Sequence, residues 1–122
     1  MSSRARSVDH FLPLTPPVLH TLVALADGDK HGYAILKEIA RRTDGAVQLS
    51  AGTLYALIRR AEADGLLVET EERPDISLDD ERRRYYRLTP LGRRVAVAEI
   101  DRLEAIVEMA REKKLVPRPR SA

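Results

Sequence analysis

The residues of this chain that are best suited to chemistry gather on one side of residues 50–64. That side would present small side chains, hydroxyl groups and two arginines: Thr53, Tyr55, Ala56, Arg59, Arg60 and Ala63. Alanine allows a close approach, a hydroxyl group can reach a phosphate, and a guanidinium can pair with a guanine edge. This composition predicts a surface that lies in a DNA major groove. The alternative is an ordinary solvated helix face.

The same residues have the start, the periodicity and the end of an amphipathic helix. Ser50 is a good N-cap, because its hydroxyl can accept a hydrogen bond from a backbone N–H one turn later. Residues at i, i+3, i+4 and i+7 form one apolar side: Leu54, Leu57, Ile58 and Ala61. Gly65 follows where helices commonly end in a left-handed residue. We therefore predict a helix that buries one side and presents the other.

Composition limits the classes of protein that this chain can be. Its 122 residues are enough for one domain plus one appended element. It has no cysteine, which excludes disulfides and thiolate metal sites. No apolar run approaches the roughly 20 residues that span a bilayer, and no apolar segment follows the N-terminal arginines. We expect a cytoplasmic protein without a membrane partner. The net charge of +2 is only weak evidence for a nucleic-acid partner.

Catalysis has little support in the sequence. His10, His20 and His31 do not have the spacing of metal ligands. The chain has no phosphate-binding glycine loop and no nucleophile elbow. The acidic run at residues 79–81 is interpreted as solvated side chains. We predict that the protein is not an enzyme, has no metal site and needs no cofactor.

The order of the expected elements is typical of a winged helix. Helices are predicted at residues 16–26 and 32–42, and a three-residue strand at 47–49 precedes the helix at 50–64. Residues 66–71 and 85–88 are β-capable and are joined by a polar segment, so they predict a β-hairpin. The fold class is α+β, mostly α with a small hairpin: a winged helix-turn-helix plus a long C-terminal dimerisation helix.

The first two helices differ in how their apolar residues are distributed. The helix at 16–26 is apolar almost all round, which predicts that it is buried or covered by a partner chain. In the helix at 32–42, one edge is predicted to be lined by Tyr33, Leu36 and Ala40, and the next edge by Ile35 and Ile39. The residues predicted to face outward are Lys37, Glu38 and Arg41.

The last predicted helix, residues 90–114, would be about 37 Å long, which is too long to stay within so small a domain. Leu91 and Val95 form a stripe that we expect to pack on their own domain. Apolar residues then recur at spacings of four, three, four and three: Ala96, Ile100, Leu103, Val107 and Ala110. Such a seam predicts a homodimer. The alternative is that the helix folds back on the first helix of its own chain.

These elements divide the chain into four parts. Residues 1–10 are predicted to be a flexible N-terminal arm, and residues 11–89 the winged-helix DNA-binding domain. Residues 90–114 are the dimerisation helix, and residues 115–122 a disordered basic tail.

Four short motifs together resemble the PadR-like transcriptional regulators. They are His31–Ile35, Gly52–Tyr55, Glu62–Leu66 and Tyr85–Gly92, and the resemblance extends over residues 12–114. It implies a dimeric winged-helix repressor, of the short subclass with a single C-terminal dimerisation helix that the N-terminal helix joins at the interface. Some members of the family bind small aromatic or drug-like ligands in or near the dimer interface.

The resemblance also implies roles for individual residues. The DNA-reading helix of the family corresponds to residues 50–64, which implies DNA contacts for Ser50, Thr53, Tyr55 and Arg59. Tyr33 resembles a family tyrosine that supports the reading head or touches the DNA backbone. The alternative for Tyr33 is a core tyrosine. Two-fold symmetry would require an inverted-repeat operator in double-stranded DNA, with half-sites about one or two helical turns apart.

The polar tip of the hairpin departs from a simple basic wing. Its acidic residues are Glu69, Glu71, Glu72, Asp75, Asp79, Asp80 and Glu81. Because carboxylates repel phosphates, we expect the tip to stay in solvent. The arginines beside it are the predicted contacts to the DNA backbone: Arg73, Arg82, Arg83 and Arg84. The alternative is that opposite charges pair across the hairpin.

A small-molecule effector would act by changing the separation of the two reading heads. Its predicted pocket lies between the first helix and the C-terminal helix of the partner, near Leu19, Val23, Leu103 and Val107. The alternative function is a winged-helix protein-interaction module without specific DNA binding. The chain has no room for the several dimerisation helices that MarR-like regulators place at both ends.

Overall fold

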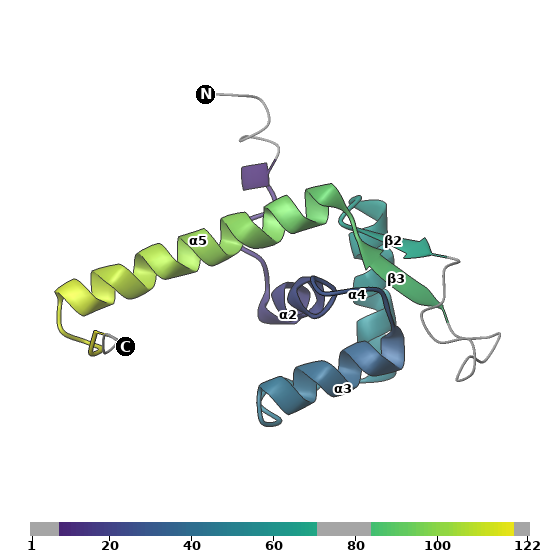
Figure 1. Cartoon of the computed structure of the whole chain (residues 1–122), viewed down its shortest axis with the longest axis horizontal. Helices are drawn as coiled ribbons and strands as arrows, with labels where there is room; N and C mark the ends of the chain where they lie inside the picture. Colours follow the sequence, from purple (N-terminus) through teal and green to yellow (C-terminus); the bar gives the residue numbers. More distant parts are fainter. Residues whose placement is uncertain (1–7, 71–83, 119–122) are drawn as a thin grey trace.

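The computed structural model describes residues 8–70 and 84–118. Within these residues, four helices and three short strands follow one another: α2 (Pro16–Ala24), β1 (Lys30–His31), α3 (Gly32–Arg42), α4 (Ala51–Ala63), β2 (Leu67–Thr70), β3 (Tyr85–Leu88) and α5 (Pro90–Glu112). Figure 1 shows α2, α3 and α4 gathered beside the strands, while α5 runs past them and leaves its C-terminal half outside the bundle. The predicted α+β class is confirmed.

The sheet has one strand more than the predicted hairpin. Its order is β1-β3-β2, and both pairs are antiparallel. The prediction missed β1, because two residues are too few to show a period; Lys30 pairs with Tyr86 and His31 pairs with Tyr85. The strand predicted at 47–49 is wrong. That segment is irregular, and its Val47 N–H donates to Thr43 Oγ1 (3.1 Å) at the end of α3 instead of pairing in the sheet.

The core is aliphatic and draws on every helix. Its most completely buried apolar side chains are Leu22, Ile35, Leu54, Ile58 and Val95. Burial of such a side chain contributes about 1.5–3 kcal/mol to folding. Since Leu54 and Ile58 belong to this core, the opposite side of α4 must face outward.

The N-terminal segment is more ordered than predicted. Val8 is only 8% exposed and belongs to the core, and the Phe11 N–H donates to the Val8 carbonyl oxygen (3.1 Å) in a short helical turn. The predicted arm boundary at residue 10 is therefore wrong for residues 8–10; a single apolar residue in a polar stretch gives no periodic signal. Residues 1–7 lie outside the described part of the chain.

Helix α2 begins at Pro16 as predicted, but it is not buried on all sides. Val23 is 42% exposed, whereas Thr21 and Leu22 are fully buried. The helix ends at Ala24, whose carbonyl oxygen accepts a hydrogen bond from Lys30 Nζ (2.6 Å). The Thr15 hydroxyl makes no capping hydrogen bond. An exposed valine on a helix in the core leaves apolar surface that a second chain can cover.

Helix α3 has the predicted limits, with one side chain placed wrongly. The Glu38 side chain, which the helix period predicts to face outward, is only 12% exposed. It lies near Lys30 Nζ (3.7 Å) and Arg42 Nε (3.3 Å). The unpredicted strand β1 brings Lys30 over this part of α3, which explains the burial.

Helix α5 packs on its own domain as far as Glu99. Leu91 and Val95 pack there as predicted, but so does Ala96, which is only 7% exposed. The predicted seam is therefore wrong at Ala96, and the uncovered stripe begins at Ile100. Beyond this point, three half-exposed apolar side chains belong to the predicted seam: Ile100, Leu103 and Val107. Two others, Ile106 and Met109, lie outside it.

A buried carboxylate fixes the N-terminal segment to α5. Glu99 is 1% exposed and accepts hydrogen bonds from Arg102 Nε (2.5 Å), Arg102 Nη2 (3.1 Å) and the Leu14 N–H (2.9 Å). The Arg102 guanidinium holds the pKa of the Glu99 carboxyl below its usual value, with help from the Leu14 N–H and against the effect of burial. The carboxylate therefore joins residues that are far apart in the sequence.

The first residues of the predicted disordered tail are folded back. Lys114 has a positive φ of 62°, and the Leu115 N–H donates to the Ala110 carbonyl oxygen (2.9 Å). Arg118 Nη1 then lies 2.9 Å from Glu108 Oε1. The prediction is wrong for residues 115–118, and residues 119–122 lie outside the described part. Among the described helices, none is long and apolar enough to cross a membrane.

Candidate nucleic-acid interface

The start of α4 is built by Ser50 and Thr53. Ser50 Oγ accepts a hydrogen bond from the Thr53 N–H (3.1 Å), so the predicted N-cap is confirmed. Ser50 Oγ also donates to Thr53 Oγ1 (2.9 Å). This pair orders the exposed beginning of the helix and leaves the Thr53 O–H hydrogen available to an outside acceptor.

The two sides of α4 are those predicted from its periodicity. Leu54, Ile58 and Ala61 are buried, and Leu57 is half-buried. The side predicted to face outward is exposed: Thr53, Tyr55, Ala56, Arg59, Arg60 and Ala63. Within the described residues, neither Arg59 nor Arg60 forms a hydrogen bond or an ion pair. Two guanidinium groups are thus held on one rigid helix and remain available for an anionic or acceptor-rich partner.

Tyr55 has a structural task as well as an exposed position. A Cβ atom built on Gly32 would lie 2.5 Å from the Tyr55 hydroxyl oxygen, so the end of the Tyr55 ring rests on the first turn of α3. This contact requires glycine at residue 32. It joins the first two short motifs of the sequence and sets the distance between α3 and α4.

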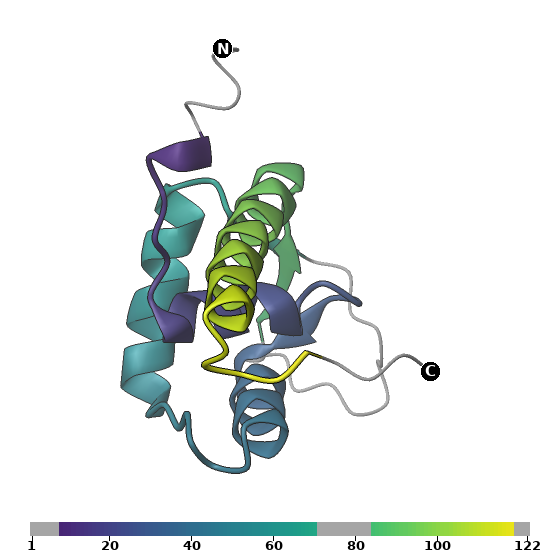
Figure 2. The same cartoon turned by 90° about the vertical axis from the view of Figure 1, so that its left-hand side faces the viewer.

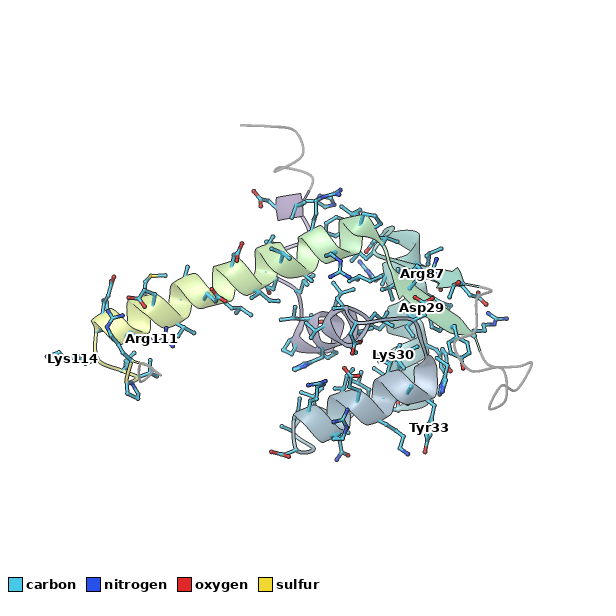
Figure 3. The ribbon with its side chains drawn as sticks, viewed as in Figure 1. Asp29, Lys30, Tyr33, Arg87, Arg111 and Lys114 are labelled. Atoms are coloured by element: carbon cyan, nitrogen blue, oxygen red, sulfur yellow. The ribbon has the colours of Figure 1, made fainter. Side chains whose placement is uncertain are left out.

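His31 and Tyr33 frame the start of α3. The Ala34 N–H donates to His31 Nδ1 (3.2 Å), so the imidazole is the N-cap of this helix. The His31 ring stacks on Tyr33 (6.4 Å between centroids) and meets Tyr85 edge-on (5.4 Å). Tyr33 itself is 58% exposed, which excludes the alternative of a core tyrosine, and Lys37 Nζ lies 5.1 Å from its ring centroid. Figure 3 shows the Tyr33 side chain pointing away from the bundle.

The end of α4 is joined to the start of α5. The Thr89 hydroxyl donates to the Gly65 carbonyl oxygen (2.6 Å) and accepts from the Gly92 N–H (2.9 Å). A Cβ atom on Gly92 would lie 2.1 Å from the Leu66 carbonyl oxygen, so no side chain fits there. Gly65 takes a left-handed conformation with φ of 81°, as predicted from its place after the helix. The last two motifs therefore hold α4 against α5.

An ion pair holds β3, the middle strand of the sheet, to the loop before β1. Arg87 on β3 donates from Nε (3.1 Å) and Nη2 (2.8 Å) to the two carboxylate oxygens of Asp29. In Figure 3, Asp29 and Arg87 come together at the junction of the α2–β1 loop and the sheet, close to Lys30. The sequence predicted none of these partners, because they are 58 residues apart.

Only the base of the wing is described. Arg84 is exposed, and its Nε lies 3.7 Å from Glu69 Oε1, so at this position the alternative of charge pairing across the hairpin is realised. The other wing arginines predicted to contact DNA lie outside the described residues: Arg73, Arg82 and Arg83. Of the acidic tip, Glu69 alone is within the described part.

A notch of about 320 Å³ separates α4 from the wing. It is lined by Tyr55, Ile58, Arg59 and Glu62 of α4 and by Arg84 and Tyr86 at the other wall. Tyr86 is only 3% exposed. Burial raises the pKa of the Tyr86 phenol, and the Glu62 and Glu69 carboxylates raise it further. The phenol, like that of any tyrosine with an ordinary or raised pKa, is protonated at neutral pH and can donate a hydrogen bond.

A second cavity, of about 760 Å³, lies between the N-terminal segment and α4. Figure 2 shows residues 10–15 running alongside α4, and apolar side chains from both, such as Phe11 and Leu57, line this space. It is not the predicted effector pocket, whose residues Val23, Leu103 and Val107 are half-exposed on a single chain. That pocket remains a prediction. The described residues contain no cluster of three His, Cys, Asp or Glu that could hold a metal ion.

Comparison with known proteins gives a consistent picture. The chain is 44% identical to the transcriptional regulator Rv3488 of Mycobacterium tuberculosis over 94 residues, 77% of this chain and 78% of that protein. A transcriptional regulator from Clostridium thermocellum, Cth-833, has a similar structure (TM-score 0.65, 25% identity, 92% of this chain and 96% of that one). The fold is also similar to that of Bacillus subtilis PadR in complex with operator DNA (TM-score 0.56, 16% identity, 68% of this chain and 46% of that one).

One family covers most of the folded part of the chain. Residues 19–98, from the middle of α2 to the middle of α5, match the family described as "Transcriptional regulator PadR-like family". This range contains all four motifs quoted above. The chain belongs to the PadR-like family of transcriptional regulators.

Proposed function

We propose that this regulator binds an inverted-repeat operator as a homodimer and represses transcription by inserting α4 of each subunit into a major groove. The observation that carries the proposal is the exposed side of α4, where two arginines that have no partner in the described part of the chain lie beside hydroxyl groups and alanines. The similarity of this fold to Bacillus subtilis PadR in complex with operator DNA supports a DNA partner.

The dimer is supported by the outer part of α5. Figure 1 shows that this part extends beyond the bundle, and it carries Ile100, Leu103 and Val107 in half-exposed positions. Ile106 and Met109, also half-exposed, lie outside that seam. A stripe this wide is more than one facing helix can cover. We therefore place the outer part of α5 against two partner elements, its α5 and its α2, where Val23 is exposed.

A protein-interaction module is the alternative that the surface favours less. A protein-binding α4 would present large apolar side chains to its partner, because buried aromatic and aliphatic anchors dominate such interfaces. Tyr55 is the one large apolar residue on the exposed side, and its hydroxyl end already rests on α3. An effector, if the regulator has one, would act by preferring one of two dimer arrangements.

The first experiment is fluorescence anisotropy of the purified protein with DNA from upstream of its own gene and with a scrambled duplex. We expect selective binding with a steep dependence on salt concentration. Arg59→Gln should weaken it strongly, while Arg94→Gln, which alters an exposed arginine on α5, should change it little. Equal, weak binding of both duplexes, followed by failure to select any sequence from random DNA, would contradict the proposal.

A further inference from the structure

The notch between α4 and the wing contains more hydrogen-bond donors than the protein uses. Arg59 and Arg84 each bring a guanidinium to its walls, and Tyr55 and Tyr86 are the two tyrosines that line it. The Tyr86 side chain is nine-tenths buried, yet within the described residues its hydroxyl forms no hydrogen bond. The hydroxyl oxygen itself is not a buried atom, so it opens into the notch, where it can donate to a ligand that accepts hydrogen bonds.

The chemistry of the walls selects an anion. Two guanidinium groups outnumber the single Glu62 carboxylate, so the net formal charge of the lining is positive. The raised pKa of Tyr86 keeps its phenol protonated and able to donate. Phosphate oxygens accept from guanidinium and hydroxyl donors together. A volume of about 320 Å³ leaves room for a phosphate and several water molecules.

The position of the notch identifies the source of that phosphate. Tyr55 and Arg59 belong at once to the notch and to the exposed side of α4. We propose that the notch binds a backbone phosphate of the operator, with the Tyr86 hydroxyl as its donor from the sheet and Arg84 as its charge partner from the wing. This inference rests on the proposed function, since it assumes that α4 lies in the major groove. The contact fixes the depth and angle of α4 without reading a base.

Arg84 must exchange partners when the phosphate enters. Its present neighbour is Glu69, at 3.7 Å and on the exposed edge of the hairpin. An exposed ion pair of this length is weak, so a phosphate can compete for the guanidinium. Glu62 opposes the phosphate from the α4 wall. Removing the Glu62 charge should therefore tighten binding if the notch holds an anion and weaken binding if it holds a cation.

The test compares Tyr86→Phe with Tyr85→Phe, the neighbouring buried tyrosine that does not line the notch. Tyr86→Phe should weaken binding to operator and scrambled duplex by about the same factor, about tenfold, with an unchanged salt slope. Tyr85→Phe should leave affinity unchanged. Arg84→Gln should lower the salt slope by about 1 for each subunit, and Glu62→Gln should tighten binding a few-fold.

Uncharged methylphosphonate groups, placed one at a time in the operator, locate the contact. At one position Tyr86→Phe should cause no further loss, because the variant and the substitution remove the same interaction. Unchanged affinity of Tyr86→Phe for an operator that the wild type binds selectively would overturn this inference and leave the proposed function intact. If the wild type bound the operator and the scrambled duplex equally, and Tyr86→Phe weakened both, the proposed function would fail while the phosphate contact remained.

A free anion is the other source of the same chemistry. Inorganic phosphate is titrated into the DNA-free protein and followed by the NMR signals of the notch residues. If Tyr86→Phe abolished saturable phosphate binding but left affinity for both duplexes unchanged, the notch would hold a free anion and the operator contact would be overturned. Failure of the wild type to bind either duplex would overturn both proposals.

Discussion

Replacing Gly92 by alanine should destabilise the fold far more than the addition of one methyl group would suggest. The new Cβ atom would lie 2.1 Å from the Leu66 carbonyl oxygen and 2.8 Å from Leu88 Cδ1. The first neighbour is backbone and cannot turn aside, so α5 must shift away from the end of α4. That shift breaks the contact of the Thr89 hydroxyl with the Gly65 carbonyl oxygen and weakens the cap of α5.

The magnitude follows from the two losses. Overpacking in a closely packed site costs about 1–3 kcal/mol, and a lost N-cap costs about 0.5–2 kcal/mol. We expect a decrease of about 2–4 kcal/mol in the free energy of unfolding, a large part of the total stability of a small protein. Urea denaturation at one fixed protein concentration measures it, because a dimer's stability depends on concentration.

Gly52→Ala is the matched control. Gly52 lies in the first turn of α4, as Gly92 lies in the first turn of α5, but a Cβ atom there meets nothing within 4 Å. Alanine should leave stability unchanged or raise it by about 0.5–1 kcal/mol. Equal stabilities of the two variants would refute the argument that the Gly92–Leu66 approach holds α4 against α5.

Three further predictions concern other contacts. The double variant Leu103→Asp, Val107→Asp should be monomeric in sedimentation velocity and should bind the operator at least tenfold more weakly. A stable dimer of this variant would contradict the seam. Glu104→Gln, which changes another exposed residue of α5, is the control. The pKa of Glu99 is lowered in the folded protein, so its contribution to stability is complete above its unfolded pKa of about 4.3 and is lost as the pH falls through the folded value. The stability gap between wild type and Glu99→Gln should thus be constant from pH 6 to 8 and narrow below about pH 5; a gap that widened in acid would reverse the assignment. Asp29→Asn should lower the melting temperature by only a few degrees, because Arg87 is partly exposed, yet it should weaken operator binding by releasing β3; unchanged binding would show that this pair does not position the wing.

Most of the fold could be predicted from the sequence, because the long helices have a strong hydrophobic period and clear start and stop residues. Ser50 and Gly65 delimit α4, and the buried positions of that helix follow its 3.6-residue period. The regulator class, as opposed to an enzyme, was likewise predicted and is confirmed by the family. Contacts between distant residues could not be predicted. Strand β1 exists only because β3, more than 50 residues later, pairs with it.

The motifs of the family were predictable as patterns but not as contacts. Gly32 and Gly92 each leave room for one neighbour, the Tyr55 hydroxyl and the Leu66 carbonyl oxygen. Sequence alone could not identify those neighbours. Glu38, Ala96 and Glu99 were misplaced or missed for the same reason, since tertiary partners that the helix period does not encode decide their burial.

The most direct test of the central claim, that α4 reads the operator, is the base preference of an Arg59→Ala variant. Its affinity is measured on operator duplexes in which each base pair of one half-site is changed in turn. We predict a loss of about 1–3 kcal/mol on the operator and a loss of preference at one guanine position only. Uniform weakening on every duplex would assign Arg59 to a phosphate, and unchanged affinity and preference would contradict the claim that α4 lies in the groove.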